Sequence, residues 1–337
     1  MKLLVSSSPH DHSGASIRRI MLDVIIALMP ALGVAVWFFK LDALRLTGVC
    51  VGTALAAEYA CRKFMRRENS LGDLSAVVTG LLLAFNLPPE LPAWMAAAGT
   101  LFAIVITKQL FGGLGYNPFN PALAGRVFLL ISFPGPMTSW TKAVWQKSVD
   151  ATTRATPLDL DALTTATPLG LAKDALRLGQ PLPFEFDPMR FFIGDINGSL
   201  GEISALALLV GAAYLLVRRV ITWQIPTAFV GSAALYAVAL KILFPETAAP
   251  VLFHLLSGGL VLGAFFMATD MVTSPVTRYG QLIFGAGCGI VTMVIRTVPS
   301  GYYPEGVSFA ILFMNAFTPL INRATKPRPF GKTGKKR

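Results

Sequence analysis

The stretch Gly115-Tyr116-Asn117-Pro118, followed by an apolar run from Ala122, has a counterpart in Gly301-Tyr302-Tyr303-Pro304, followed by a run from Ser308. A second pair of segments matches in the same way, since Ala84-Phe85-Asn86 precedes Pro88-Pro89 as Ala268-Thr269-Asp270 precedes Pro275. Both pairs are about 185 residues apart, and a fixed offset indicates an internal duplication. The alternative is that Gly, Tyr and Pro recur by chance at membrane interfaces.

Composition places the chain in a membrane. Of its 337 residues, 54% are hydrophobic and 14% are charged, which is too apolar for a soluble globule. A helix needs about 20 mostly apolar residues to cross the hydrocarbon of a bilayer. Such segments, two of them shorter and interrupted, lie near 20–39, 43–61, 74–88, 92–111, 121–134, 203–217, 224–244, 251–268, 281–298 and 305–322. We therefore expect about ten transmembrane helices.

Charge placement predicts how these helices are oriented. Lys and Arg gather in short cytoplasmic loops. With the N-terminus inside, the cytoplasmic side receives the basic residues at 2, 18–19, 62–67, 218–219, 278 and 323–337. Both termini are then cytoplasmic. The net charge of +11 follows from this topology, so no nucleic-acid partner is expected.

The duplication and the span count together predict the architecture. If each half holds five spans, an odd number, the second copy enters the membrane from the opposite side. We expect an all-α membrane protein with two inverted repeats of five helices, some of them broken. Its parts are an N-terminal repeat at 1–134, an extracytoplasmic loop at 135–202, a C-terminal repeat at 203–323 and a basic cytoplasmic tail at 324–337. No cleavable signal peptide is evident before the first apolar run.

Broken helices in inverted repeats usually surround a polar site near the bilayer centre. Carboxylates at that depth are costly unless they are paired or hydrated, so Asp270 and Glu305 are candidate functional residues. The alternative for both is helix capping. The full candidate set is Asn86, Asn117, Asn120, Asp270, Thr273, Ser274 and Glu305.

Other polar residues in or near apolar runs have simpler expected roles. Asp23, one turn after Arg18 and Arg19, is expected to form an ion pair or a cap, and His254 is expected to pack within its helix. The three cysteines are scattered with no histidine nearby, so neither a metal site nor a disulfide framework is indicated. An iron–sulfur ligand shared with another chain is the open alternative for them.

The polar loop contains one pattern twice, Asp150-Ala-Thr-Thr-Arg-Ala-Thr156-Pro-Leu and Asp161-Ala-Leu-Thr-Thr-Ala-Thr167-Pro-Leu. Without a nearby histidine these threonines are poor nucleophiles, so we interpret them as attachment points. An Asp, then Ser or Thr three residues later, then Ala-Thr is similar to the pattern at which flavin transferases join FMN to threonine through a phosphoester. A Thr-rich loop without such a role is the alternative.

Further motifs set this loop in context. They are Gly115 to Arg126, Gly198-Ser-Leu-Gly-Glu202, Phe265 to Pro275 and Tyr303-Pro-Glu-Gly306. In this order, together with Asp161 to Leu169, they resemble the RnfD family of the Rnf electron-transport complex, which is related to the NqrB component of the sodium-translocating NADH:quinone reductase. The resemblance runs from Ser7-Ser8-Pro9-His10 to the final apolar run.

The resemblance implies a covalent FMN on Thr167, with Asp161, Thr164 and Ala166 recognised by a flavin transferase. Thr156 in the duplicate pattern is the alternative attachment site. Thr164-Thr165 stands where the family has Ser-Gly, and the missing glycine removes backbone freedom. The family also implies a second, non-covalent, riboflavin-like flavin between the two repeats, for which the polar candidate set is the expected site, as it is for an ion path.

The expected function is that of a bacterial inner-membrane component that passes electrons between ferredoxin and NAD through FMN, coupled to movement of Na+ or H+. The chain has no dinucleotide-binding βαβ pattern and no four-cysteine cluster, so ferredoxin and NAD are expected to bind other subunits of the complex. Two alternatives remain open: a channel or secondary transporter for a small polar solute, and a structural component that has lost its flavin.

Overall fold

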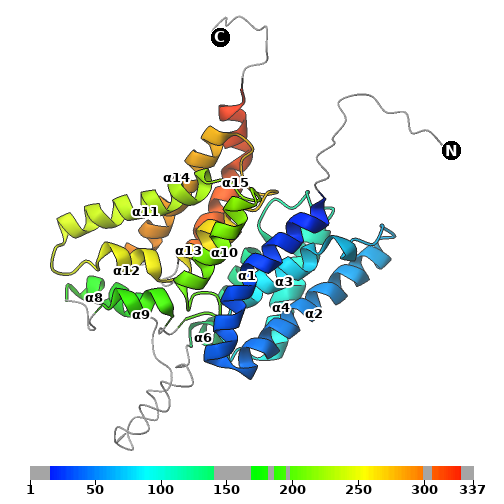
Figure 1. Ribbon diagram of the computed structural model, residues 1–337, viewed down its shortest axis with the longest axis horizontal. Coiled ribbons are helices and arrows are strands. Elements are labelled where there is room, and N and C mark those ends of the chain that lie inside the picture. The colour runs from blue at the N-terminus through cyan, green and yellow to red at the C-terminus, as the bar shows by residue number, and fades with distance from the viewer. Residues whose placement is uncertain (1–15, 140–167, 181–185, 195–197, 299–305, 328–337) are drawn as a thin grey trace, which may run out of the picture.

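The computed structural model describes residues 16–139, 168–180, 186–194, 198–298 and 306–327, and the regular elements in these ranges are all helical (Figure 1). The helices are α1 (Ile17–Phe39), α2 (Leu41–Phe64), α3 (Ser75–Phe85), α4 (Ala93–Leu101), α5 (Pro121–Ser132), α6 (Pro134–Thr138), α8 (Pro168–Leu178), α9 (Pro188–Ile193), α10 (Ala205–Val217), α11 (Gln224–Leu243), α12 (Val251–Leu256), α13 (Leu260–Leu262), α14 (Arg278–Thr297) and α15 (Val307–Thr325). The expected all-α class is confirmed for the described chain.

In the described part of the chain four helices, α1, α11, α14 and α15, are long and apolar enough to cross a membrane. Shorter apolar helices are α3, α4 with its continuation to Gln109, α5 and α10. Each of the ten apolar runs predicted from the sequence contains helix. The chain is therefore a multi-pass membrane protein.

The run expected at 251–268 is broken into α12, α13 and a following segment. Gly258 and Gly259 interrupt it with φ angles of +65° and +67°, which L side chains adopt only at a cost. A Cβ on Gly259 would also lie 2.7 Å from a carboxylate oxygen of Glu202. The helix therefore breaks where a buried carboxylate packs closely against the backbone.

Two helices continue as π-helix before they end. The segment η2 (Phe102–Gln109) continues α4, and η4 (Gly263–Met267) continues α13. Backbone bonds span five residues in both, from Leu110 N to Val105 O (2.9 Å) and from Ala268 N to Gly263 O (2.7 Å). Such segments occur frequently at functional sites.

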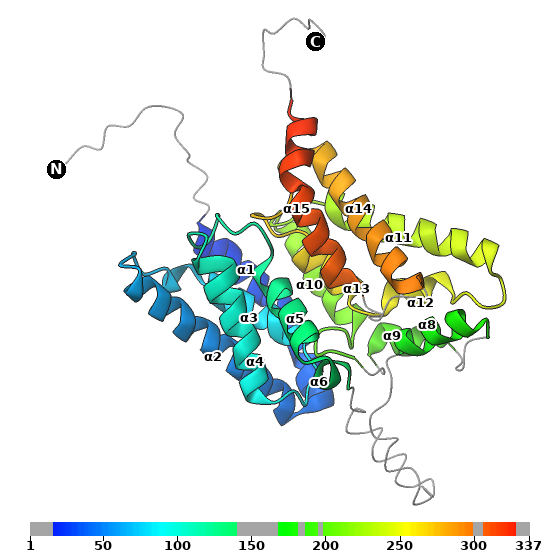
Figure 2. The same cartoon turned by 180° about the vertical axis from the view of Figure 1, so that it is seen from behind.

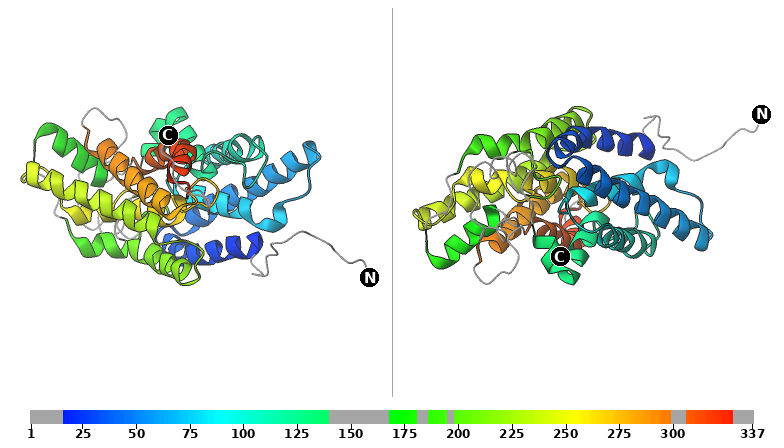
Figure 3. Two further views of the ribbon diagram at one scale, coloured as in Figure 1. Left: turned by 90° about the horizontal axis from the view of Figure 1, so that it is seen from above. Right: turned by 90° about the horizontal axis from the view of Figure 1, so that it is seen from below.

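The first-half helices lie toward one end of the long axis and most of the second-half helices toward the other (Figures 1 and 3). The halves meet where α1 packs against α10 and α5 packs against α15. One apolar core runs through both halves and includes Leu28 of α1, Phe229 of α11 and Phe284 of α14. The start of α1 and the end of α15 lie on the opposite side of the molecule from α6, α8 and α9 (Figure 2).

Candidate functional site

A buried polar group, which we call the arginine centre, connects the two halves and comprises Asn86, Asn120, Arg126 and Glu202. Nη1 of Arg126, in α5, donates to Oδ1 of Asn86 at 2.7 Å, and its Nη2 lies 3.7 Å from Oε1 of Glu202. The side chains of Arg126 and Glu202 are each 4% exposed. Removal of either partner alone from a buried pair of this kind destabilises the protein, because the other charge is left buried and unpaired.

Asn86 and Asn120 each lie at a helix end, and we include Asn120 in this centre because its side-chain amide, like that of Asn86, contacts Met267. Asn86 follows α3, and its Nδ2 donates to the carbonyl of Leu82 (2.7 Å) and contacts Sδ of Met267 (3.5 Å). Oδ1 of Asn120 accepts the first backbone N–H groups of α5, and its Nδ2 donates to the carbonyl of Met267 (3.2 Å). Both amides thus reach Met267, the last residue of η4, from the other half.

A second group, which we call the lysine centre, lies beside η2 and comprises Glu58, Ser75 and Lys108. Nζ of Lys108 is 2.7 Å from Oε2 of Glu58 and 2.6 Å from Oγ of Ser75. The side chains of Lys108 and Glu58 are 2% and 0% exposed. Two further hydrogen bonds extend from this group toward the surface. The hydroxyl of Ser70 donates to Glu58 (2.5 Å), and the hydroxyl of Ser75 donates to Asp73 (2.6 Å).

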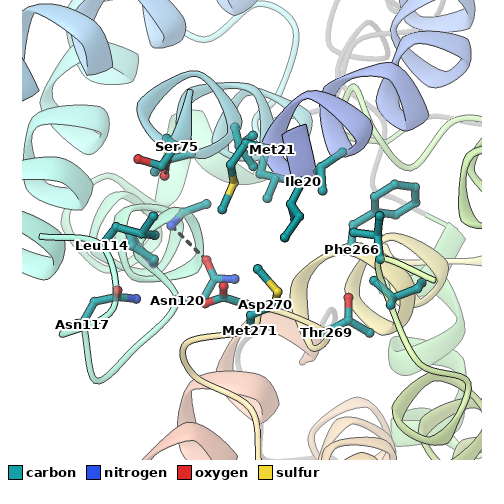
Figure 4. A pocket seen from close by; sticks show the side chains of 18 of the residues that line it. Ile20, Met21, Ser75, Leu114, Asn117, Asn120, Phe266, Thr269, Asp270 and Met271 are labelled. Carbon is teal, nitrogen blue, oxygen red and sulfur yellow. Dashed lines mark hydrogen bonds between the residues drawn. The ribbon is translucent and has the colours of Figure 1, made fainter. Parts of the chain in front are cut away.

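A cavity of about 90 Å³ lies between the lysine centre and the loop after η4 (Figure 4). This volume holds a few water molecules or a partly hydrated ion. Its polar lining consists of Ser75, Thr79, Lys108, Asn117, Asn120, Thr269 and Asp270. Residues of both halves therefore face one small cavity, and the rest of its lining is apolar.

Asp270 enters this cavity from a turn that it also organises. Its Oδ2 accepts from the hydroxyl of Thr273 (3.0 Å), and its Oδ1 accepts weakly from the N–H of Val272 (3.5 Å). Ser274 N donates to the carbonyl of Asp270 (3.1 Å), and Thr318 donates to the carbonyl of Thr273 (2.9 Å). Asp270 therefore does not cap a described helix; its carboxylate stabilises this turn and also lines the cavity.

The described residues contain no cation within 4 Å of the Asp270 carboxylate. Asn117, 5% exposed, donates from Nδ2 to the carbonyl of Phe119, but its buried Oδ1 has no partner among the described residues. One carboxylate and one amide oxygen therefore line the cavity with no described cation in direct contact with them.

The structure brings together Asn117, Asn120 and Asp270 at the cavity, and places Asn86 next to them in the arginine centre. Thr273 supports Asp270, and Ser274 bonds only through its backbone among the described residues. The other predicted site residues lie outside the described ranges; they are Thr156, Asp161, Thr164, Ala166, Thr167 and Glu305.

Sequence reasoning missed Glu58 and Lys108 as site residues. Both lie in or at the end of apolar runs, near 43–61 and 92–111, and intramembrane charge is the signal that singled out Asp270. Arg126 and Glu202 were included only as members of motifs. Asp23 forms the expected ion pair, but its partner is Arg218 at the end of α10 (3.2 Å), and it also accepts from Tyr214 of α10 (2.8 Å).

Directly after Thr167, α8 is fixed to α14 on the side of the molecule opposite the start of α1. Nζ of Lys173 donates to the carbonyl of Ile295 (2.9 Å), and the neighbouring Arg296 donates to the carbonyl of His254 (2.6 Å). Burial lowers the pKa of the Lys173 ammonium below its ordinary value, although Asp174 opposes the shift. His254 is buried against Phe253 as expected, but neither ring nitrogen has a partner among the described residues.

Broken helices and buried ionisable side chains occur together in membrane proteins that transport ions. Residues 4–331 match the model of the NQR2, RnfD, RnfE family, and the chain belongs to this family. The family expected from the motifs is thereby confirmed.

Three relatives, each the D component of its complex, match over nearly their whole lengths. That of the Na(+)-translocating ferredoxin:NAD(+) oxidoreductase complex of Acetobacterium woodii is 47% identical, with 99% of this chain and 96% of the relative covered. That of the ion-translocating oxidoreductase complex of Halorhodospira halophila is 41% identical, with 97% and 95% covered. That of the proton-translocating ferredoxin:NAD(+) oxidoreductase complex of Clostridium ljungdahlii is 42% identical, with 97% and 96% covered.

Proposed function

We propose that this chain is the RnfD component of an ion-translocating ferredoxin:NAD+ oxidoreductase complex of the bacterial inner membrane. The observation that carries this proposal is the full-length similarity to three such components. The chain acts with the other subunits of the complex, which supply the ferredoxin and NAD sites, and it is not catalytic alone. Its own contribution is to pass electrons and to form part of the ion path.

Electron transfer in this proposal uses FMN attached covalently to Thr167, after recognition of Asp161, Thr164 and Ala166 by a flavin transferase. The described residues next to Thr167 suit a phosphoester: α8 begins at Pro168, and helix N-termini favour phosphate. The cations Lys173 and Arg296 add positive charge between α8 and α14. When bound, the flavin supplies the redox chemistry, and the protein supplies the tether and the local field.

Mass spectrometry of the 148–177 peptide tests this assignment. The protein should be purified from cells that contain a competent flavin transferase. We expect the added mass of FMN on Thr167. Its presence on Thr156 would move the tether to the duplicate pattern, and its absence from both would leave a structural component or a solute transporter as the better interpretation.

Two inverted repeats of five spans are the architecture that we propose, with the repeats at 1–134 and 203–323. Support comes from like contacts in the two halves. The α2 helix packs against α3 and α4 as α11 packs against η4 and α14, and α5 follows η2 as α15 follows α14. Across the halves, α1 meets α10 and α5 meets α15. Contacts between equivalent helices are what a twofold relation between repeats produces.

Both termini are cytoplasmic in this proposal, and the 135–202 loop is extracytoplasmic. The start of α1 and the end of α15 lie on one side of the molecule, while α8 and α9, which belong to the loop, lie on the other (Figures 1 and 2). The basic pairs Arg66-Arg67 and Arg218-Arg219 follow α2 and α10, as expected for cytoplasmic ends.

The ion path in this proposal includes the cavity at Asp270. Its walls and the lysine centre contain two carboxylates, Asp270 and Glu58, but one ammonium, Lys108. A buried carboxylate without a counter-charge takes up a cation or a proton. Na+ or H+ is therefore the expected occupant, with Asn117 supplying a further oxygen.

A second, riboflavin-like flavin between the repeats stays a prediction. Asn86 and Asn120 give it little support, because their amide groups are bonded to Arg126, Leu82, Met267 and the start of α5. Among the candidate residues, Asn117 alone has a side-chain oxygen described as buried and unpartnered. We therefore assign Asn117 and Asp270 to the ion path.

A further inference from the structure

We propose that Lys108 is a tethered cation that competes with the translocated cation, because its ammonium neutralises either Glu58 or Asp270 but not both. This inference rests on the proposed role of the Asp270 cavity as a cation site. It adds two residues, Lys108 and Glu58, and a mechanism of release to that site.

The ammonium of Lys108 is only partly engaged in this structure. It has three N–H donors, and its described partners are Glu58 Oε2 at 2.7 Å and Ser75 Oγ at 2.6 Å. Lys108 also lines the cavity. One donor therefore remains for the cavity side, while the other two hold the ammonium at the lysine centre.

Asp270 lies on the same cavity and is within the electrostatic reach of Lys108. Its described partners are the hydroxyl of Thr273 and the N–H of Val272, neither of which neutralises its charge. A flexible four-carbon stem lets a lysine ammonium change partner without movement of its backbone. Lys108 therefore has two acceptors available across one small space.

Charge balance decides which partner is used. The cavity lining contains no charged residue other than Lys108 and Asp270 among the described residues, and Glu58 lies directly behind Lys108. Asp73, partly exposed, is reached only through Ser75. In a medium of low dielectric constant an unneutralised carboxylate is costly. Lys108 can neutralise one of the two carboxylates, Glu58 or Asp270, so the other needs one further positive charge.

Two states follow from this balance. With Lys108 on Glu58, as in this structure, Asp270 and Oδ1 of Asn117 can receive a cation. With Lys108 on Asp270, the cation is displaced, and Glu58 retains only the hydroxyl of Ser70 (2.5 Å) among its other described partners. Movement of one ammonium thus exchanges an internal cation for a transported one.

Equilibrium binding of radioactive Na+ to the purified complex tests the inference, with variants that move affinity in opposite directions. Glu58→Gln removes the competing acceptor, so Lys108 pairs with Asp270 and Na+ affinity falls by about fivefold or more. The double variant Glu58→Gln with Lys108→Met has no tethered cation, so its Na+ affinity exceeds that of the wild type by a similar factor. Lys108→Met alone leaves Glu58 unneutralised as well as Asp270, so its Na+ affinity rises by at least as much, and this variant serves if Glu58→Gln does not assemble.

Asp42→Asn is the matched control, because Asp42 is also an α2 carboxylate but is 48% exposed and pairs with Arg45. It should leave Na+ affinity unchanged. If the complex binds no Na+, the same variants are compared by the pH at half-maximal rate, which should fall in Glu58→Gln and rise in the double variant. A fixed Lys108–Glu58 ion pair has no net charge, and it predicts that the double variant, which is also uncharged there, keeps the wild-type affinity or pH. That result, shifts of the same sign in the two variants, or no shift, overturns the inference.

Asp270→Asn separates this inference from the proposed function. If that variant keeps the cation dependence of the wild type, the Asp270 cavity is not the cation site and both proposals fail. If Asp270→Asn loses the dependence while the Glu58 and Lys108 variants do not diverge, the cation site stands and the tethered cation is wrong.

Discussion

Arg126 donates from Nη1 to Oδ1 of Asn86 over 2.7 Å, so that the end of α3 is joined to the middle of α5. The same guanidinium faces Glu202, which precedes α10 in the other half. One buried cation therefore connects three segments that are far apart in the sequence.

Replacement of Arg126 by Leu is expected to destabilise the protein by about 3–5 kcal/mol, because Glu202 would lose its described ion-pair partner in a buried environment. Thermal unfolding of the detergent-solubilised protein measures this loss. Arg45→Leu is the control, since Arg45 is 46% exposed and surface pairs contribute about 0–1 kcal/mol. Equal stability of the two variants would contradict the assignment of Arg126 to the core of the fold.

Thr167→Val should abolish covalent flavin and leave assembly of the complex intact. The substitution removes the hydroxyl that forms the phosphoester but keeps the size of the side chain. In-gel flavin fluorescence after denaturation is the measurement, and Thr156→Val, which should stay fluorescent, is the control. The reverse result in the two variants would place the flavin on Thr156.

Attachment of α8 to α14 should strengthen as the pH rises toward 10.5, the ordinary pKa of lysine. Burial lowers the pKa of Lys173 in the folded protein, so the folded state releases this proton at lower pH than the unfolded state, and stability increases over that interval. Hydrogen exchange of residues 168–180 measures the effect. In Lys173→Met the pH dependence should disappear, and an unchanged profile would assign it to another group.

Gly259→Ala is expected to cost at least about 1–2 kcal/mol, because the residue has a φ of +67° that L side chains disfavour by that amount. The new Cβ would also approach Glu202. Gly231→Ala, in the middle of α11 with nothing within 4 Å of its Cβ position, should instead raise stability by up to about 1 kcal/mol. Thermal unfolding compares them, and equal shifts would contradict the strained turn.

The helices could be predicted from the sequence because each is a run of apolar residues, which local composition reveals. The break within 251–268 was not predicted, although Gly258 and Gly259, which interrupt the run, are adjacent in the sequence; the close approach of Glu202 to Gly259 is visible only in the structure. Asp270 and Asn117 were identified from their position in motifs, and the structure places both on one cavity.

Long-range partners were not predictable in the same way. Lys108 and Glu58 are 50 residues apart and meet only because η2 packs against α2. Asp23 was expected to pair with Arg18 or Arg19, close along the chain, but its partner Arg218 is 195 residues away. From a single sequence we can tell which helix contains a charged residue, but not which distant residue forms an ion pair with it.

The π-helical segment η2 sets the angle at which Lys108 leaves its helix. Each residue of an α-helix turns the chain by about 100°, so conversion of one π turn into an α turn would swing the residues beyond it around the helix axis by a comparable angle. Lys108 would leave Glu58 as part of that rotation. The pairing of Lys108 with Glu58 therefore depends on the wide turn of η2 as well as on the packing of η2 against α2.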